Sequence, residues 1–341
     1  MFRKSLRMPL RVAAVLTLCL PFLVACGGDD KSTIRVYSGR HYDLEVAFTQ
    51  FAKETGINVE FLYGGDAELL ERIKAEGEDT PADIFMTVDA GNLWNAAQQD
   101  LLLPLQSPVL DEAVPEGLRD PQDRWVGLSM RVRTLMYNPD KVQPSDFDAT
   151  DSYAGLGDPK WKGRLCMRTS KSSYVQSLVA QMIDRQGRDR ALEIVKSWVA
   201  NDVNIIGDDV TILKTVNAGG CDVAITNHYY LARILDDDSN FKVKPYWANQ
   251  SGEGVHVNIS GAGVLKNSDN VADAQKLIEW LATKGANAFV DGNHEYPVNP
   301  DVKPEELISG FGTFKFQPIN AEAYGKLNAD AIALMSEAGY R

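Results

Sequence analysis

Hydrophobic residues in the first third of the chain follow two spacings in turn. Residues 34–38 and 82–88 are short apolar runs, and residues 57–63 alternate between apolar and polar side chains, which predicts three strands. In the intervening segments, apolar residues recur every three or four positions, which predicts helices at 43–55, 67–76 and 90–99. Because strands and helices alternate along the chain, we expect a mostly parallel sheet flanked by helices.

The same alternation returns in the middle of the chain, between two longer apolar segments. The longer segments, 125–137 and 255–265, are predicted to be strands that cross between two lobes. The other expected elements are strands at 164–167 and 222–226 and helices at 174–185, 188–200, 209–218, 229–235, 272–284 and 321–337. We therefore expect a two-lobed α/β fold in which the middle of the chain is an inserted lobe. A cleft between two lobes is a usual place for a small ligand.

The first residues of the chain have a composition of their own. Residues 1–25 carry four Lys and Arg side chains and no acid, and they end in the apolar run 12–25. This pattern predicts a secretory signal that is too short for a comfortable membrane span. The sequence 23–26, Leu-Val-Ala-Cys, resembles a bacterial lipobox, in which Cys26 becomes the lipidated first residue of the mature protein. A plain signal peptide with an incidental Cys26 is the alternative.

The charge of the chain changes once this segment is set aside. The full sequence has 35 Lys and Arg and 47 Asp and Glu, a formal charge of −12. Without the four cations of residues 1–25, 31 remain against the same 47 acids, which gives the mature protein −16. Nucleic acid and anionic lipid both bind clustered cations, and the sequence has no basic stripe. We therefore expect no nucleic-acid partner.

Four cysteines in 341 residues are too few for a fold built on disulfides. Cys19 leaves with the signal and Cys26 would be acylated, so Cys166 and Cys221 remain in an oxidising compartment. These two either form a disulfide or stay as buried free thiols, which pack as small apolar residues. The sequence leaves both possibilities open.

Tyrosines stand at the ends of several predicted strands. Tyr42 follows His41 at the turn after the first strand, and Tyr174 opens a helix. Tyr229 and Tyr230 form a pair just past another strand end, where both reach one ligand only from a helix start or an irregular turn. In an open α/β sheet, ligands bind beyond the carboxyl ends of the strands. All four tyrosines are therefore placed where a ligand is expected.

Several phenols and an imidazole together favour a hard, highly charged cation. Fe(III) can displace the phenol proton, although the pKa of a free tyrosine is about 10. Zinc and calcium are less suited, because the sequence contains no H-E-x-x-H, C-x-x-C or EF-hand spacing. Tyrosines can also stack on a glycan or an aromatic ligand, so the pattern alone leaves that possibility open.

Six segments carry a family resemblance. They are Y-S-G-R-H-Y-D (37–43), T-V-D-A-G-N-L (87–93), W-V-G-L-S-x-R-x-R (125–133), D-P-K-W-K-G-R (158–164), N-x-Y-Y-L-A-R (227–233) and N-x-E-Y-P-V (293–298). In this order, they resemble the ferric-ion-binding proteins of bacterial iron ABC transporters, which belong to the periplasmic binding protein superfamily. The resemblance implies a class II fold of two lobes, each a mostly parallel sheet flanked by helices, joined by two hinge strands.

The resemblance also implies a ligand set for Fe(III). In the tyrosine-rich branch of the family, the matching ligands are Tyr42, Tyr174, Tyr229 and Tyr230. His41, in the same turn as Tyr42, is a ligand in some members and not in others. Another branch uses an acidic ligand just after the third strand, near Asp89, but the context T-V-D-A-G-N-L belongs to the tyrosine-rich branch.

A cleft arginine is also implied by the resemblance. Arg131 and Arg133 are two positions apart on the first long strand, 125–137, so both face the same side. Such a cation lowers the pKa of nearby phenols and can hold a synergistic anion such as carbonate. We favour Arg131 over Arg133. Glu295, in the segment 293–298, is interpreted as structural.

The predicted organisation follows from these points. The mature chain starts with a linker at 26–32; one lobe is formed by 33–132 plus 262–300 and the other by 133–261 plus 301–341. The resemblance implies a monomer in the periplasm or cell envelope, which delivers iron to an ABC permease with its ATPase. The sequence at 23–26 adds the expectation of a lipid anchor at Cys26.

Two other functions remain as alternatives. The first is a binding protein of the same superfamily for a polyamine, thiamine or a phosphonate. The second is a secreted hydrolase, but the sequence contains no G-x-S-x-G elbow and no recognisable Ser, His and Asp set. We therefore expect a binding protein and no enzyme.

Overall fold

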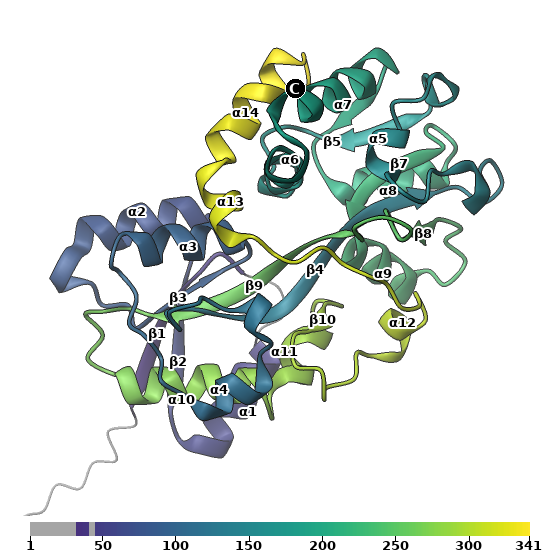
Figure 1. Ribbon diagram of the computed structural model, residues 1–341. Helices are drawn as coiled ribbons and strands as arrows, with labels where there is room; N and C mark the ends of the chain where they lie inside the picture. The colour runs from purple at the N-terminus through teal and green to yellow at the C-terminus, as the bar shows by residue number, and fades with distance from the viewer. Residues whose placement is uncertain (1–31, 41–44) are drawn as a thin grey trace, which may run out of the picture. The chain divides into compact units, whose positions relative to one another are not determined.

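The computed structural model describes residues 32–40 and 45–341 (Figure 1). Contacts group Ser32–Arg341 into one compact unit. The expected signal at 1–25, Cys26, and the pair His41 and Tyr42 lie outside the described residues. Among the helices that the structure describes, none is long and apolar enough to cross a membrane.

The described strands form one mixed sheet, in the order β2-β1-β3-β9-β4-β7-β5-β6, with β8 and β10 also paired to β4. Their bounds are Thr33–Ser38 (β1), Asn58–Tyr63 (β2), Ile84–Thr87 (β3), Val126–Tyr137 (β4), Leu165–Arg168 (β5), Asn204–Ile206 (β6), Val223–Asn227 (β7), Lys244–Tyr246 (β8), His256–Val264 (β9) and Tyr296–Pro297 (β10). The sequence predicted all of the longer strands. It missed β6, β8 and β10, whose two or three residues are too few to show an alternation.

The helices lie on both sides of this sheet (Figure 1). Their bounds are Glu45–Thr55 (α1), Asp66–Glu76 (α2), Ala90–Gln98 (α3), Pro108–Ala113 (α4), Ser152–Gly155 (α5), Ser173–Gln186 (α6), Arg188–Ala200 (α7), Asp209–Asn217 (α8), His228–Asp237 (α9), Val271–Ala282 (α10), Ala286–Asp291 (α11), Glu306–Ser309 (α12), Ala321–Lys326 (α13) and Asn328–Glu337 (α14). The expected α/β class is confirmed.

Parallel pairing is found at both ends of the sheet. At one end, β1 runs parallel to β2 and β3, and at the other, β5 runs parallel to β6 and β7. Between these sets, β4 and β9 pair with each other in antiparallel register, with Arg131 opposite Asn258 (Figure 1). All nine residues of β9 are buried, among them the polar His256 and Asn258.

The hydrophobic interior has more than one core. One cluster gathers side chains from β1, β3, α1 and α10, among them Phe51, Phe85 and Trp280. A second cluster includes Trp161 and Trp198, and a third, smaller cluster surrounds the end of β7. The first cluster also draws in residues from the last third of the chain, among them Phe289 and Tyr324.

The single helix expected at 321–337 is wrong, because α13 and α14 are separated at Leu327. Gly325 lies in the last turn of α13, where glycine weakens a helix by about 1 kcal/mol relative to alanine. A Cβ at Gly325 would stand 2.4 Å from a ring carbon of Trp94, so α13 can approach α3 only with glycine at this position. The tertiary contact therefore takes precedence over helix propensity.

Cys166 and Cys221 form a disulfide, which decides between the two possibilities that the sequence left open. Their Cα atoms are 5.8 Å apart and 55 residues separate them in the chain. Cys166 lies in β5, and Cys221 comes just before β7. The disulfide therefore joins the strand that leads towards Tyr174 to the strand that leads towards Tyr229.

Candidate metal centre

Three of the predicted tyrosines lie at the starts of two helices. Tyr229 and Tyr230 occupy the first turn of α9, directly after β7, and their ring centroids are 4.4 Å apart. Tyr174 is the second residue of α6. Tyr229 and Tyr230 are buried, whereas Tyr174 is half-buried. The adjacent pair thus starts a helix, the arrangement that lets both rings approach one point.

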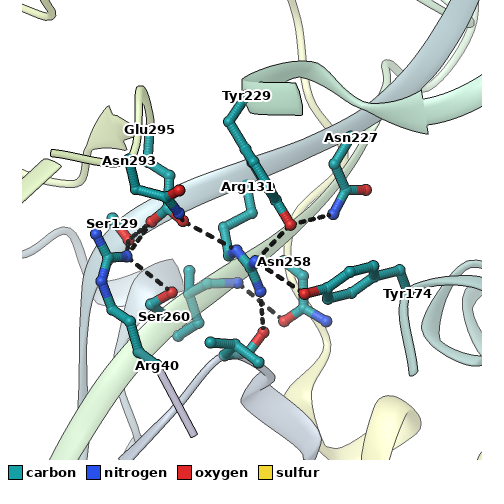
Figure 2. A network of polar contacts seen from close by, with 12 residues as sticks. Arg40, Ser129, Arg131, Tyr174, Asn227, Tyr229, Asn258, Ser260, Asn293 and Glu295 are labelled. Carbon is teal, nitrogen blue, oxygen red and sulfur yellow. Dashed lines mark hydrogen bonds and ion pairs between the residues drawn. The ribbon is translucent and has the colours of Figure 1, made fainter. Parts of the chain in front are cut away.

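Arg131 brings the hydroxyl groups of two of these tyrosines together (Figure 2). Its Nη2 donates to the Oη of Tyr174 at 3.1 Å and also to the Oη of Tyr229. The guanidinium carbon lies 4.9 Å and 4.8 Å from the two ring centroids, within cation–π range. Tyr174 is 43 positions from Arg131 in the chain, and Tyr229 is 98 positions from it. The structure therefore brings both tyrosines to one buried cation.

Two hydrogen-bond donors point at the hydroxyl oxygen of Tyr229. Its Oη accepts hydrogen bonds from Arg131 and from Nδ2 of Asn227, the latter at 2.9 Å. Donors aimed at an oxygen favour its charged form, and burial opposes it. Burial prevails in the absence of a metal and raises the pKa of Tyr229 well above its ordinary value, although Arg131 lowers it.

Tyr174 responds in the opposite direction. Burial raises the pKa of Tyr174, but the charge of Arg131 and hydrogen bonds from neighbouring groups lower it by a larger amount. The pKa of Tyr174 is therefore below its ordinary value. Arg168 adds to this effect, with its guanidinium carbon 5.2 Å from the Tyr174 ring centroid. One phenol of the cluster is therefore prepared to lose its proton first.

Arg133 has different partners from Arg131. Its Nη1 donates to Asn227 at 3.0 Å and to Asp209 at 3.3 Å, and its Nη2 donates to the carbonyl of Ile225. Asp209 also accepts from Arg168 at 2.9 Å. Burial lowers the pKa of Arg168, but Asp209 and a hydrogen-bonded Tyr230 raise it above its ordinary value. Arg133 is thus part of the support behind the tyrosines, and Arg131 is the arginine that contacts their oxygens.

A cavity of about 770 Å³ opens beside Tyr174. It is lined by Gly39, Gly64, Gly65, Asp66, Ala67, Glu68, Val88, Asp89, Gly91, Asn92, Asn95, Lys171, Ser173, Tyr174, Gln176, Tyr324, Gly325, Asn328 and Ala329. Burial and the charge of Asp89 raise the pKa of Asp66 to about 7, so this carboxyl binds a proton far more readily than an exposed one. The cavity therefore carries less negative charge than its sequence suggests.

Asp89 is a structural acid in this arrangement. Its Oδ1 accepts from the backbone N–H of Asn92 at 3.0 Å and caps α3, and its Oδ2 accepts from Nδ2 of Asn258 at 2.7 Å. Both oxygens thus have partners on β9 and α3.

The sequence interpretation missed a buried ionic network next to the tyrosines. Glu295 lies between Arg40 and Arg131, and all three side chains are almost completely inaccessible (Figure 2). Burial raises the pKa of Glu295, but the two arginines and Ser129 lower it to about 2, so the group is ionised. The segment 293–298 was the available signal, because it matched the family, but nothing local connects Glu295 to Arg131.

The donors in this centre are phenols and not the usual metal-binding groups. Within residues 32–40 and 45–341, no cluster of three or more His, Cys, Asp or Glu could hold a metal ion. His41 and Tyr42 are not among the described residues, so their place relative to the other tyrosines stays a prediction.

Known proteins resemble this chain over most of its length. The family model for bacterial extracellular solute-binding proteins matches residues 79–310. Iron uptake protein A1 of Synechocystis sp. is 38% identical over 92% of this chain and 88% of its own length. The Fe(3+)-binding periplasmic protein of Serratia marcescens is 29% identical over 97% of this chain and 99% of its own length.

A solved structure agrees with these relatives. A Trichodesmium protein in complex with iron and citrate ligands is 42% identical, with a TM-score of 0.85 over 91% of this chain and 100% of that protein. The fold, the extent of the family match and the identity to the Synechocystis protein lead to one conclusion. The chain belongs to the bacterial extracellular solute-binding protein family.

Proposed function

We propose that this protein captures Fe(III) outside the cytoplasmic membrane and delivers it to an ABC permease with its ATPase. The observation that carries the proposal is the meeting of Tyr174 and Tyr229 at Arg131, with Tyr230 packed against Tyr229. The relatives named for ferric iron and iron uptake support it. No catalytic step is needed for this function, and we propose none.

The proposed ligands are Tyr42, Tyr174, Tyr229 and Tyr230, with His41, water or an anion such as carbonate completing the shell. Fe(III) is a hard cation, and a phenolate is a hard oxygen donor. Three or four phenolates on Fe(III) leave a charge near zero or minus one, which the neighbouring Arg131 can offset in a buried site. Arg131 would also face a bound anion, and Arg133 would support it from behind through Asn227.

The proposed lobes are 33–132 plus 262–300 and 133–261 plus 301–341. Two separate hydrophobic clusters and the two long strands β4 and β9 support two lobes, but the clusters cross the bounds at Tyr296, in the second cluster, and at Ala321 and Tyr324, in the first. In such an arrangement, ligands from both lobes meet when the lobes close, and opening at the permease removes some of them. The protein would act as a monomer.

We also propose that Cys26 carries the lipid anchor in the cell envelope, after removal of residues 1–25. The Leu-Val-Ala-Cys sequence at 23–26 and the polar residues that follow support it. Mass spectrometry of the mature N-terminus in the native host is expected to find a diacylglyceryl group on Cys26. An unmodified N-terminus at another residue would contradict the anchor and leave the iron site untouched.

The iron function has a simple test. Purified protein mixed with Fe(III) supplied as a weak nitrilotriacetate chelate is expected to turn orange to red, because phenolate-to-Fe(III) charge transfer absorbs visible light. A titration followed at this band should reach saturation at one iron per chain. A colourless protein that binds no Fe(III), but is stabilised by a polyamine, thiamine or a phosphonate, would favour the alternative binding function.

A further inference from the structure

Glu295 is a buried carboxylate surrounded only by donors. Its Oε1 accepts from Nε of Arg131 at 3.2 Å and from Nδ2 of Asn293, and its Oε2 accepts from Nη1 of Arg40 and from Oγ of Ser129 (Figure 2). The side chain has no exposed surface. Both oxygens thus have two partners each, and a neutral or shorter side chain could not keep all four.

The two arginines at Glu295 come from different parts of the fold. Arg40 follows the end of β1, and its guanidinium also donates to Ser260 and to the carbonyl of Phe289, with the Phe289 ring centroid 4.1 Å away. Arg131 lies in β4. A buried cation without a partner is strongly disfavoured, so one carboxylate that neutralises part of this double charge holds both arginines in place.

All three edges of the Arg131 guanidinium are occupied. The Nε edge meets Glu295, Nη1 donates to the carbonyl of Val88 at 2.9 Å, and Nη2 faces the two phenol oxygens. A planar guanidinium held on two edges cannot rotate without losing both contacts. The direction of Nη2 is therefore set by Glu295 and Val88, on the side away from the tyrosines.

We propose that Glu295 is a positioning residue for iron binding, which aligns Arg131 on the oxygens of Tyr174 and Tyr229 and anchors Arg40 in the same contact. This inference rests on the proposed iron function. Glu295 touches neither phenol, so its effect passes through Arg131. A purely structural role would lower the stability of the fold and leave the iron site unchanged.

The test is the substitution Glu295→Gln, measured with Fe(III) supplied as the nitrilotriacetate chelate. The NH2 group of Gln is a donor and cannot accept a hydrogen bond, so it replaces one of the two accepting oxygens of Glu295. Either Arg131 or Arg40 therefore loses its acceptor. Iron affinity, measured by chelator competition, is expected to fall about 10–100-fold, the usual effect of losing a contact behind a metal ligand. The charge-transfer band is expected to move to longer wavelength, because a phenolate that loses a hydrogen-bond donor gives up its electron more readily.

A double-mutant cycle identifies the route of the effect. In an Arg131→Lys background, Glu295→Gln is expected to change iron affinity much less than in the wild type, because the contact through Nε no longer exists. Equal fold-changes in both backgrounds would overturn the inference. If Glu295→Gln does not fold, Glu295→Asp takes its place, because it keeps the charge but is too short to reach both arginines. We expect a smaller loss of iron affinity, with the charge-transfer band again moved to longer wavelength.

Asp120→Asn is the matched control. Asp120 is also buried and paired with an arginine, since Nε of Arg124 donates to it at 2.6 Å and Nη2 at 3.0 Å. This variant is expected to lose stability but keep the wild-type band and iron affinity. A Glu295→Gln protein that folds and binds iron as the wild type does would overturn the positioning role alone. A wild-type protein that binds no iron would overturn the proposed function, and this inference with it.

Discussion

Replacing Tyr229 by Phe is expected to lower Fe(III) affinity by at least about 100-fold and to weaken the visible charge-transfer band. Contacts behind a metal ligand are typically worth about 10–100-fold, and a directly bound phenolate should exceed them. The substitution also leaves Nη2 of Arg131 and Nδ2 of Asn227 without their common acceptor. This should cost about 1–3 kcal/mol of unfolding free energy, so affinity must be measured well below the melting temperature.

Tyr230→Phe is expected to have a similar effect on iron and a smaller effect on stability. Tyr137→Phe is the matched control, because Tyr137 is a buried tyrosine that packs against Phe147, with ring centroids 5.7 Å apart, in the second core. The control should keep the wild-type band. An unchanged band and affinity in Tyr229→Phe or Tyr230→Phe would remove that residue from the proposed ligand set.

The pH dependence of iron binding has a defined sign. Each phenol must lose its proton to bind Fe(III), so iron affinity should fall as the pH falls. Burial raises the pKa of Tyr229 well above its ordinary value, so this phenol holds its proton near neutral pH and releases it on binding Fe(III). Tyr229→Phe should therefore reduce the number of protons released per iron. A wild-type affinity that does not change with pH would contradict phenolate ligation.

Removing the disulfide is expected to lower the free energy of unfolding by about 2–4 kcal/mol, because the bond restricts a long loop in the unfolded chain. Cys166 and Cys221 are 55 positions apart, and both lie in the third cluster with Tyr229 and Tyr230. Urea unfolding of a Cys166→Ala, Cys221→Ala double variant against the wild type measures the loss. Alanine is chosen because both positions are buried.

A reductant separates the bond from the packing of the two side chains. Dithiothreitol should lower the urea concentration at which half of the wild-type protein is unfolded. It should leave this midpoint unchanged in the double variant. If wild-type protein unfolds at the same urea concentration with and without the reductant, the bond makes no contribution to stability. If the double variant is less stable than the wild type but reduction of the wild type has no effect, the lost stability comes from the packing of the two side chains.

The strand and helix pattern predicted most of the fold because its periods are local. Apolar residues at spacing two or at three to four are visible in the sequence, and β1 to β3 with α1 to α3 follow them. The break between α13 and α14 was not predictable in the same way. Close to this break, Gly325 packs against Trp94, which is far away in the chain, and the helical spacing does not show this contact.

The sequence by itself determined which side chains could form the site. Tyr174, Tyr229 and Tyr230 stand at strand ends or helix starts, and that placement follows from the order of elements along the chain. The same strand spacing put Arg131 and Arg133 on one face, but it could not tell their roles apart. Their opposite residues, Asn258 for Arg131 and Asn227 for Arg133, became known only from the pairing of β4 with β9 and β7.

Only the tertiary structure decided what holds the tyrosines in place. Glu295 and Arg131 are 164 positions apart, and no local pattern links them. Their contact depends on the antiparallel pairing of β10 with β4, which places Tyr296 opposite Met130. A buried charge needs a partner, but the sequence does not say which one. Local periodicity thus determined the helices and strands and the positions of the tyrosines at their ends. Long-range packing determined the charged groups around these tyrosines, which make them a candidate iron site.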